Sequence, residues 1–358
     1  MVDLDDKDAV LKIQGGDTVL KSVDGLPDQL LQSFKESQEL NFSDEFKQVK
    51  NIVVSGMGGS RFTPLIIKEL FKKTLKVPYI INDDYNLPGF VNSDSLVILS
   101  SYSGTTEEVL TNGKAALAKG AKLTGVTEGG ELASFLQENN FTAYVFNPIH
   151  NPSKQPRIGL GYMVGGHLGI LTKLGFVDID KQTVENSLIN LSSLLKNFTI
   201  DLPKNQNLAK QFAQKLFQRY PYYVVSEFLV GVGNAIANQT NETAKSISSF
   251  RVIPELNHHL MEGLKFPDRF HDIATFVFFY SQLYSESIKK RFQITKEVVE
   301  QNKVETLWYE LKGKSEMEQV FELMGFGSYL SMYLSVLYGQ DPTAIPFVDY
   351  FKKKLKEV

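Results

Sequence analysis

The sequence predicts an α/β protein with two domains, each built on a mostly parallel β-sheet with helices on both faces. Short apolar runs alternate with amphipathic helical segments, and this alternation occurs on both sides of a polar segment near 199–207. The length of 358 residues is long for one domain and sufficient for two. We expect an N-terminal helical segment at 1–45, domains at 46–195 and 205–340, and a C-terminal helix at 341–358.

In the first domain, strand-like apolar runs alternate with segments whose apolar residues recur every three or four positions. Pro64 falls in the first turn of one helix, where its missing N–H is tolerated, and Gly120 suits the position just after the next helix. The last helix is rich in glycine, which indicates close packing against a neighbour. The predicted strands are 51–55, 77–81, 95–100, 122–127 and 142–146, and the predicted helices are 62–71, 107–118, 132–138 and 159–174.

The second domain repeats this order of strands and helices. Parallel sheets of this kind bind ligands at the carboxyl ends of their strands, so the turns that follow the strands are the places to look for chemistry. The predicted strands are 222–226, 249–253, 274–279 and 305–311, and the predicted helices are 228–245, 255–261, 287–301, 316–338 and 346–357.

Composition excludes several classes of function. The 38 Lys and Arg nearly balance the 41 Asp and Glu. The net charge of −3 therefore lacks the excess of positive charge that is typical of nucleic-acid-binding proteins. With no cysteine there is no disulfide scaffold, iron–sulfur cluster, cysteine nucleophile or Cys-ligated zinc, and five His leave little for metal binding. The acidic N-terminus is unlike a signal peptide, and the apolar run 273–280 is too short to span a membrane. We expect a cytoplasmic protein without metal or cofactor.

Two strand-to-helix turns in the first domain are the sharpest functional feature. The glycines of 56–60 (GMGGS) allow the backbone to approach an anion closely, and 101–106 (SYSGTT) adds hydroxyl side chains. Each turn is followed by a helix whose N-terminus favours negative charge. Either turn alone is explained equally well by tight turning and helix capping, but two at successive strand ends favour a phosphate site. Neither is a nucleotide-binding loop with the glycine–lysine pattern.

These turns, together with Pro156-Arg157 before the glycine-rich helix, resemble the sugar isomerase (SIS) domain. The second half contains 241–245 (NETAK) and 254–259 (PELNHH), which resemble the NENAK and PE-x-NHN segments of the bifunctional phosphoglucose/phosphomannose isomerase family. The resemblance covers roughly 50–355, with the motifs in the family's order. It implies two SIS-type domains and an interconversion of glucose 6-phosphate, and mannose 6-phosphate, with fructose 6-phosphate.

The resemblance also implies a role for each matching residue. Arg157 lies near the sugar carbons and favours the negative charge of an enediolate, and Glu242 is the base that moves a proton between C2 and C1. His258 opens the sugar ring from the other subunit of a homodimer, and Lys352, with Lys353 as the alternative, assists ring opening. The sugar 6-phosphate is bound by Gly59, Ser60, Ser101, Ser103 and Thr106.

These residue types suit the reaction. One carboxylate can remove and return the proton without a metal or a redox cofactor, an arginine remains charged beside the enediolate, and a histidine titrates in the range that ring opening needs. The sequence departs from the family at Arg61, Thr105 and His259, which stand where glycine, asparagine and asparagine are usual. Two alternatives remain: an isomerase of amino-sugar phosphates, and a sensor that binds a phosphosugar without turnover.

Overall fold

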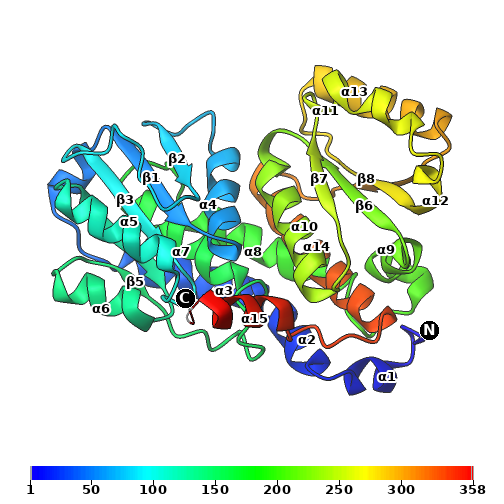
Figure 1. Ribbon diagram of the computed structural model, residues 1–358, viewed down its shortest axis with the longest axis horizontal. Coiled ribbons are helices and arrows are strands. Elements are labelled where there is room, and N and C mark those ends of the chain that lie inside the picture. Colours follow the sequence, from blue (N-terminus) through cyan, green and yellow to red (C-terminus); the bar gives the residue numbers. More distant parts are fainter. Residues whose placement is uncertain (1, 356, 358) are drawn as a thin grey trace.

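The computed structural model describes residues 2–355 and 357 and contains two parallel sheets (Figure 1). The strands are β1 Asn51–Gly56, β2 Tyr79–Asn82, β3 Ser95–Ser100, β4 Lys122–Thr127, β5 Tyr144–Val145, β6 Tyr220–Val225, β7 Ser249–Val252, β8 Ala274–Tyr280 and β9 Glu305–Glu310. The first sheet has the order β2-β1-β3-β4-β5 and the second the order β7-β6-β8-β9, with all pairs parallel. The predicted fold class is confirmed.

Helices cover the sheets, precede the first strand and follow the last. The α-helices are α1 Lys7–Lys12, α2 Gly16–Asp24, α3 Leu26–Gln38, α4 Gly59–Leu70, α5 Glu107–Ala118, α6 Gly130–Glu138, α7 Leu160–Lys173, α8 Lys181–Leu195, α9 Leu208–Leu216, α10 Val230–Thr243, α11 Leu256–His259, α12 Phe270–Ile273, α13 Glu286–Gln301, α14 Glu316–Leu337 and α15 Pro346–Leu355. The short 3₁₀ turns are η1 Asp44–Gln48, η2 Lys204–Gln206, η3 Glu227–Leu229 and η4 Met261–Lys265.

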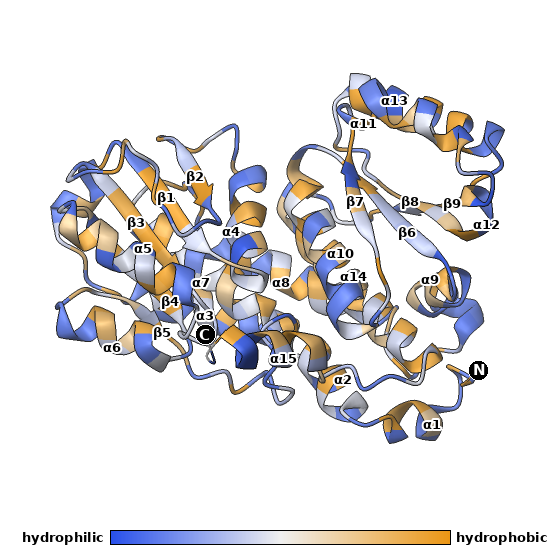
Figure 2. Ribbon diagram, viewed as in Figure 1, coloured by the Kyte–Doolittle hydropathy of each residue, from blue (hydrophilic) through white to orange (hydrophobic). Residues whose placement is uncertain are grey.

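The strands are buried on both faces because helices cover both faces. In β1, Ile52 and Val54 belong to one apolar cluster and Val53 to another on the opposite face. The central strands β3 and β8 are buried along their whole length, and Figure 2 shows β1 and β3 as apolar. Continuous apolar runs are typical of parallel strands covered on both faces, which is why these strands could be identified from the sequence.

The first of these clusters continues from the first half of the chain into the second. Helix α10 packs against both α4 and α14, and α3 packs along α7. A side-chain contact also joins the halves, because Arg61 Nη1 donates a hydrogen bond to Asn234 Oδ1 of α10 (3.3 Å). This contact holds the N-terminal half of α10 beside the start of α4, which follows β1 (Figure 1).

Helix α14 is long and apolar enough to cross a membrane by length and composition, and no other helix in the described residues passes that test. Its apolar stretch is wholly buried inside the protein, where α8, α9 and α10 pack against it. A central core helix has these properties, and we interpret α14 as one. The shorter apolar run considered from the sequence, 273–280, corresponds to the core strand β8.

Several elements differ from the sequence prediction. Helices α8 and α9 were not predicted, although each begins at a capping residue: Asp180 accepts a hydrogen bond from Thr183 N–H, and Asn207 accepts one from Lys210 N–H. The predicted helix 228–245 begins as η3 and ends at Thr243. The predicted helix 255–261 is divided into α11 and η4.

Candidate active site

The first predicted phosphate turn connects β1 to α4. Gly56 is required there, since a Cβ atom would lie 2.5 Å from the carbonyl oxygen of Ser60, and Gly58 has a left-handed φ of 50°. The amides of Gly58 and Gly59 donate no hydrogen bond to any part of the chain that the structure describes. Two N–H groups at a helix N-terminus are therefore available to an anion, and one of them belongs to Gly59, a predicted phosphate ligand.

The second turn connects β3 to α5 and is locked to the first. Tyr102 N–H donates a hydrogen bond to Ser60 Oγ (2.9 Å), and Ser100 Oγ lies 2.8 Å from the Ser60 carbonyl oxygen. The hydroxyls of Ser101 and Thr106 are 2.8 Å apart, whereas Ser103 is exposed. Because β1 and β3 are neighbours, the two turns meet at one edge of the sheet.

Arg157 lies in the loop before α7 and is only 2% exposed. Its Nε donates to Thr243 Oγ1 (3.2 Å) and its Nη1 to Gln155 Oε1 (2.9 Å). Its Nη2 donates to the carbonyl oxygens of Pro342 (2.6 Å) and Thr343 (3.0 Å). Four of the five guanidinium N–H groups are used, and one on Nη1 remains. This arginine joins its own loop to the end of α10 and to the segment before α15.

Glu242 is in the last turn of α10, and its Oε2 lies 3.8 Å from Arg157 Nη1. This distance is too long for a hydrogen bond, and the carboxylate accepts none from the described residues. Its side chain is 35% exposed. Burial raises the pKa of the Glu242 carboxyl, while the positive charges of Arg157, Lys245 and Lys352 oppose that rise. Among the described residues, the Glu242 carboxylate therefore has no hydrogen-bond donor, and the remaining Nη1 N–H of Arg157 lies near it.

The loop that carries Arg157 also contacts the second turn. Asn151 Nδ2 donates to Tyr102 OH (2.9 Å) and to the Gln155 carbonyl oxygen (3.1 Å), and a Cβ atom on Gly159 would lie 2.7 Å from the Tyr102 ring. A continuous set of contacts therefore runs from the phosphate turn to Arg157. The two turns, Arg157 and Glu242 are therefore linked through one connected set of contacts.

The chain matches two family models: a SIS domain at residues 45–143 and a bacterial phospho-glucose isomerase C-terminal SIS domain at residues 205–355. A bifunctional phosphoglucose/phosphomannose isomerase of Caldicellulosiruptor bescii is 31% identical over 95% of this chain and 99% of its own length. The chain belongs to the bifunctional phosphoglucose/phosphomannose isomerase family. The isomerase of that name from Aquifex aeolicus is 28% identical over 86% of this chain and 91% of its own length.

Solved structures agree on the fold of this isomerase-family chain. A hypothetical protein from Thermus thermophilus superposes with a TM-score of 0.76 over 98% of this chain and 93% of its own, at 16% identity. At that identity the likeness shows the fold alone. The family membership therefore rests on the sequence matches, and the structural likeness agrees with the observed fold.

In this member of the family, strand β7 separates His258 from Glu242 along the chain. It is exposed on α11, and β7 runs from the end of α10 toward α11. The four residues of β7 alone extend about 10 Å. Figure 1 shows α11 at the top of the molecule and α15 near the bottom. The chain does not bring His258 to its own Glu242. The adjacent His259 lies 3.6 Å from Glu255.

Of the two C-terminal lysines considered, Lys352 is the one whose charge acts on the Glu242 carboxyl, where it opposes the rise in pKa. Both lie on α15, and the segment before this helix is held by Arg157. Arg61, which replaces the usual glycine, is paired with Asp83 at 2.5 Å and with Asn234, so its charge is already engaged.

Three neighbours of the site were not predicted from the sequence. Gln155 and Thr243 hold the guanidinium of Arg157, and Lys245 donates to backbone oxygens beside Glu242. The signal for two of them was present, since Thr243 and Lys245 belong to the NETAK segment that was used only to locate Glu242. Gln155 had no signal beyond its position two residues before Arg157.

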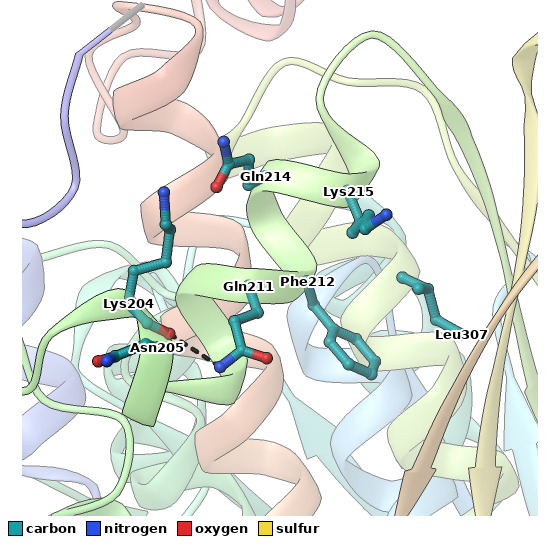
Figure 3. Close-up of a pocket in the computed structure, with 7 residues that line it drawn as sticks. All are labelled: Lys204, Asn205, Gln211, Phe212, Gln214, Lys215 and Leu307. Atoms are coloured by element: carbon teal, nitrogen blue, oxygen red, sulfur yellow. Dashed lines mark hydrogen bonds between the residues drawn. The ribbon is translucent and has the colours of Figure 1, made fainter.

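A separate hollow of about 580 Å³ lies beside α9 and does not include any predicted site residue. Figure 3 shows the Phe212 ring directed toward Leu307, and Gln211 donating a hydrogen bond to the Lys204 carbonyl oxygen. Its polar lining residues belong mostly to one helix and the turn before it. We assign it no part in the chemistry.

Proposed function

We propose that the chain is an aldose–ketose isomerase that interconverts glucose 6-phosphate and mannose 6-phosphate with fructose 6-phosphate through a cis-enediol. The observation that carries this proposal is the Glu242 carboxylate, which accepts no hydrogen bond from the described residues and lies 3.8 Å from Arg157, whose loop contacts the second of the two turns. The family membership supports the same reaction. We also propose that it works in the cytoplasm, where these sugar phosphates are retained by their charge.

Glu242 is suited to move the proton. The carboxylate accepts the proton from C2 of the aldose and returns it to C1, so that one group serves as base and then as acid. Burial, which raises the pKa of the Glu242 carboxyl, makes the carboxylate a stronger base. Since the carboxylate oxygens accept no hydrogen bond from the described residues, no such bond has to break before the carboxylate accepts the proton.

Arg157 is suited to stabilise the intermediate. Removal of the proton places negative charge on the oxygens of C1 and C2, and the free Nη1 N–H lies in the region beside Glu242. The other four N–H groups hold the guanidinium in place, so little reorganisation is needed when the charge develops. Arginine keeps its charge throughout.

The two turns support binding of the phosphate. The amides of Gly58 and Gly59 and the hydroxyls of Ser101 and Thr106 lie at neighbouring helix N-termini. We assign Gly59, Ser60, Ser101, Ser103 and Thr106 to the 6-phosphate. The Ser60 hydroxyl accepts a hydrogen bond from the Tyr102 amide, so its own proton is available to donate to a phosphate oxygen.

Ring opening requires an acid and a base near O5 and O1. We assign Lys352, whose charge reaches Glu242, and His258 of a second copy of the chain. A homodimer is supported by the exposure of His258 away from its own site and by the apolar residues of α15. Phe347 is 86% exposed, and Tyr350 and Phe351 are also exposed, as expected of a helix that a second copy covers (Figure 2).

The direct test is formation of fructose 6-phosphate by the purified protein from glucose 6-phosphate and, separately, from mannose 6-phosphate, with EDTA present. We expect turnover of both sugars, and loss of turnover in Glu242→Gln but not in Glu286→Gln, which removes an exposed carboxylate of α13. Turnover of glucose 6-phosphate alone would remove the mannose half of the proposal. Failure with both sugars, while a thermal shift still reports sugar-phosphate binding, would favour the phosphosugar sensor instead.

A mixing experiment tests the homodimer and the origin of His258. Co-expressed Glu242→Gln and His258→Asn chains form hybrid dimers that contain one intact site only if His258 acts across the interface. With random pairing we expect about a quarter of the wild-type activity, although each variant alone is inactive. Dimers without recovered activity would place His258 in its own subunit's site, and a monomeric wild-type protein would refute the homodimer.

A further inference from the structure

Lys245 follows the end of α10 in an unfavourable backbone conformation. Its φ is 55°, in the left-handed region that a lysine rarely adopts. Its ammonium donates to the carbonyl oxygens of Glu242 (2.9 Å) and Thr243 (3.3 Å), which belong to the last turn of α10. Such carbonyls lack partners within the helix and attract a cation. The lysine therefore closes the helix that carries Glu242.

The third contact of Lys245 reaches another part of the chain. Its Nζ lies 2.6 Å from the carbonyl oxygen of Asp341, in the connection between α14 and α15. A lysine ammonium has three N–H donors, and all three are used on backbone oxygens. Lys245 thus has no N–H left for a substrate, which argues for a role through its neighbours.

Arg157 holds the same connection. Its Nη2 donates to Pro342 and Thr343, directly after the residue that Lys245 holds. Asp341 Oδ1 in turn accepts from Thr343 N–H (2.7 Å) and its hydroxyl, which makes 341–343 a compact turn. Two cations therefore fasten one turn, and α15 begins three residues later.

We propose that Lys245 is a positioning residue of the isomerase. It connects the end of α10 to the 341–343 turn and so fixes the positions of Glu242, Arg157 and Lys352 relative to one another. This inference rests on the proposed function. It assigns a task to the last residue of the NETAK segment that is separate from proton transfer.

The charge of Lys245 supplies a readout that a purely structural role would not move. It lowers the pKa of the Glu242 carboxyl, as Arg157 and Lys352 also do, and the charges of Asp341 and Glu242 both raise the pKa of Lys245. Burial and the nearby Arg157 lower the pKa of Lys245 itself to about 8, so the ammonium is charged at neutral pH. Removing that charge raises the pKa of Glu242.

The experiment compares Lys245→Met with Lys245→Arg. The matched control is Lys303→Met, because Lys303 also follows a helix with a left-handed φ of 62° but is exposed. For K245M we expect kcat/KM to fall about 10–100-fold and the acidic limb of its pH profile to rise by roughly 0.5–1 unit. K245R retains the charge, so its acidic limb stays in place while its rate falls less. K303M matches the wild type.

Hydrogen exchange of the 338–355 peptides gives a second readout that needs no activity. We expect faster exchange there in K245M than in the wild type, with the rest of the chain unchanged. A K245M protein with wild-type exchange in these peptides, or with a lower rate and an unmoved acidic limb, overturns the proposal. A wild-type protein without isomerase activity refutes the proposed function instead, and the exchange result still decides whether Lys245 fastens α15. If K245M does not fold, K245R tests the same exchange.

Discussion

Replacing Arg157 by lysine tests whether the one free guanidinium N–H acts in the reaction. Lysine keeps the positive charge but has three donors in place of five. If its ammonium serves the Pro342 and Thr343 carbonyls, Thr243 and Gln155 each lose a partner, at about 1–1.5 kcal/mol each. We therefore expect a stability loss of roughly 2–3 kcal/mol, and the N–H that faces Glu242 is lost as well.

The catalytic consequence is larger than the loss of stability. A lost donor to a developing oxyanion costs about 10²–10³-fold in kcat, and we expect that loss for R157K with KM little changed. The assay is the steady-state formation of fructose 6-phosphate, with urea unfolding to confirm that the variant is folded under the assay conditions. Arg61→Lys is the matched control, since Arg61 pairs with Asp83. A raised KM with wild-type kcat would refute the reasoning, because Arg157 would then bind substrate and intermediate equally.

Three further variants test other parts of the site. Glu242→Gln should lower kcat by about 10²–10⁴-fold and leave the thermal unfolding temperature unchanged, because the carboxylate accepts no hydrogen bond from the described residues; a variant with substantial turnover would exclude Glu242 as the base. Ser60→Ala should raise KM several-fold and lower stability by about 1–2 kcal/mol, since the Tyr102 amide loses its acceptor; an unchanged KM would remove Ser60 from the phosphate site. Burial lowers the pKa of His167 to about 3 from 6.5, so the unfolded chain takes up a proton first as the pH falls below 6.5. The free energy of unfolding should therefore fall by about 2 kcal/mol between pH 7 and pH 5 because of this residue. Urea unfolding of His167→Gln at the two pH values should show a fall that is smaller by this amount. An equal fall in the free energy of unfolding in the variant and the wild type would contradict a buried neutral histidine.

The fold was predictable from the sequence because its strands are continuous apolar runs and the two turns proposed to bind phosphate contain residues that few other structures require. Gly56 is an example, since its backbone meets the Ser60 carbonyl too closely for any side chain. Helices α8 and α9 were not predicted, although Asp180 and Asn207, whose side chains cap them, are start signals visible in the sequence. The predicted helix to residue 245 was too long because Lys245 leaves the helical region of φ.

The site was predictable only in part, because its contacts join residues that are distant in the chain. The meeting of the two turns followed from the neighbouring parallel strands. By contrast, nothing near Arg157 in the sequence predicts that Pro342 and Thr343 accept its hydrogen bonds, since these residues meet only when α14 brings the chain back to the first sheet. The motif resemblance supplied Glu242, and the pairing of Glu242 with Arg157 came from the fold.

The geometry of this pair argues for function over stability. Arginine–carboxylate pairs that stabilise a fold are frequently bidentate, with two short parallel hydrogen bonds. Here Arg157 is buried, which costs free energy, and four hydrogen bonds to other groups offset that cost. Those same bonds hold the guanidinium 3.8 Å from Glu242, so that the remaining N–H and the carboxylate both stay free for a substrate placed beside them. The open geometry of this pair therefore supports the roles proposed for Glu242 and Arg157.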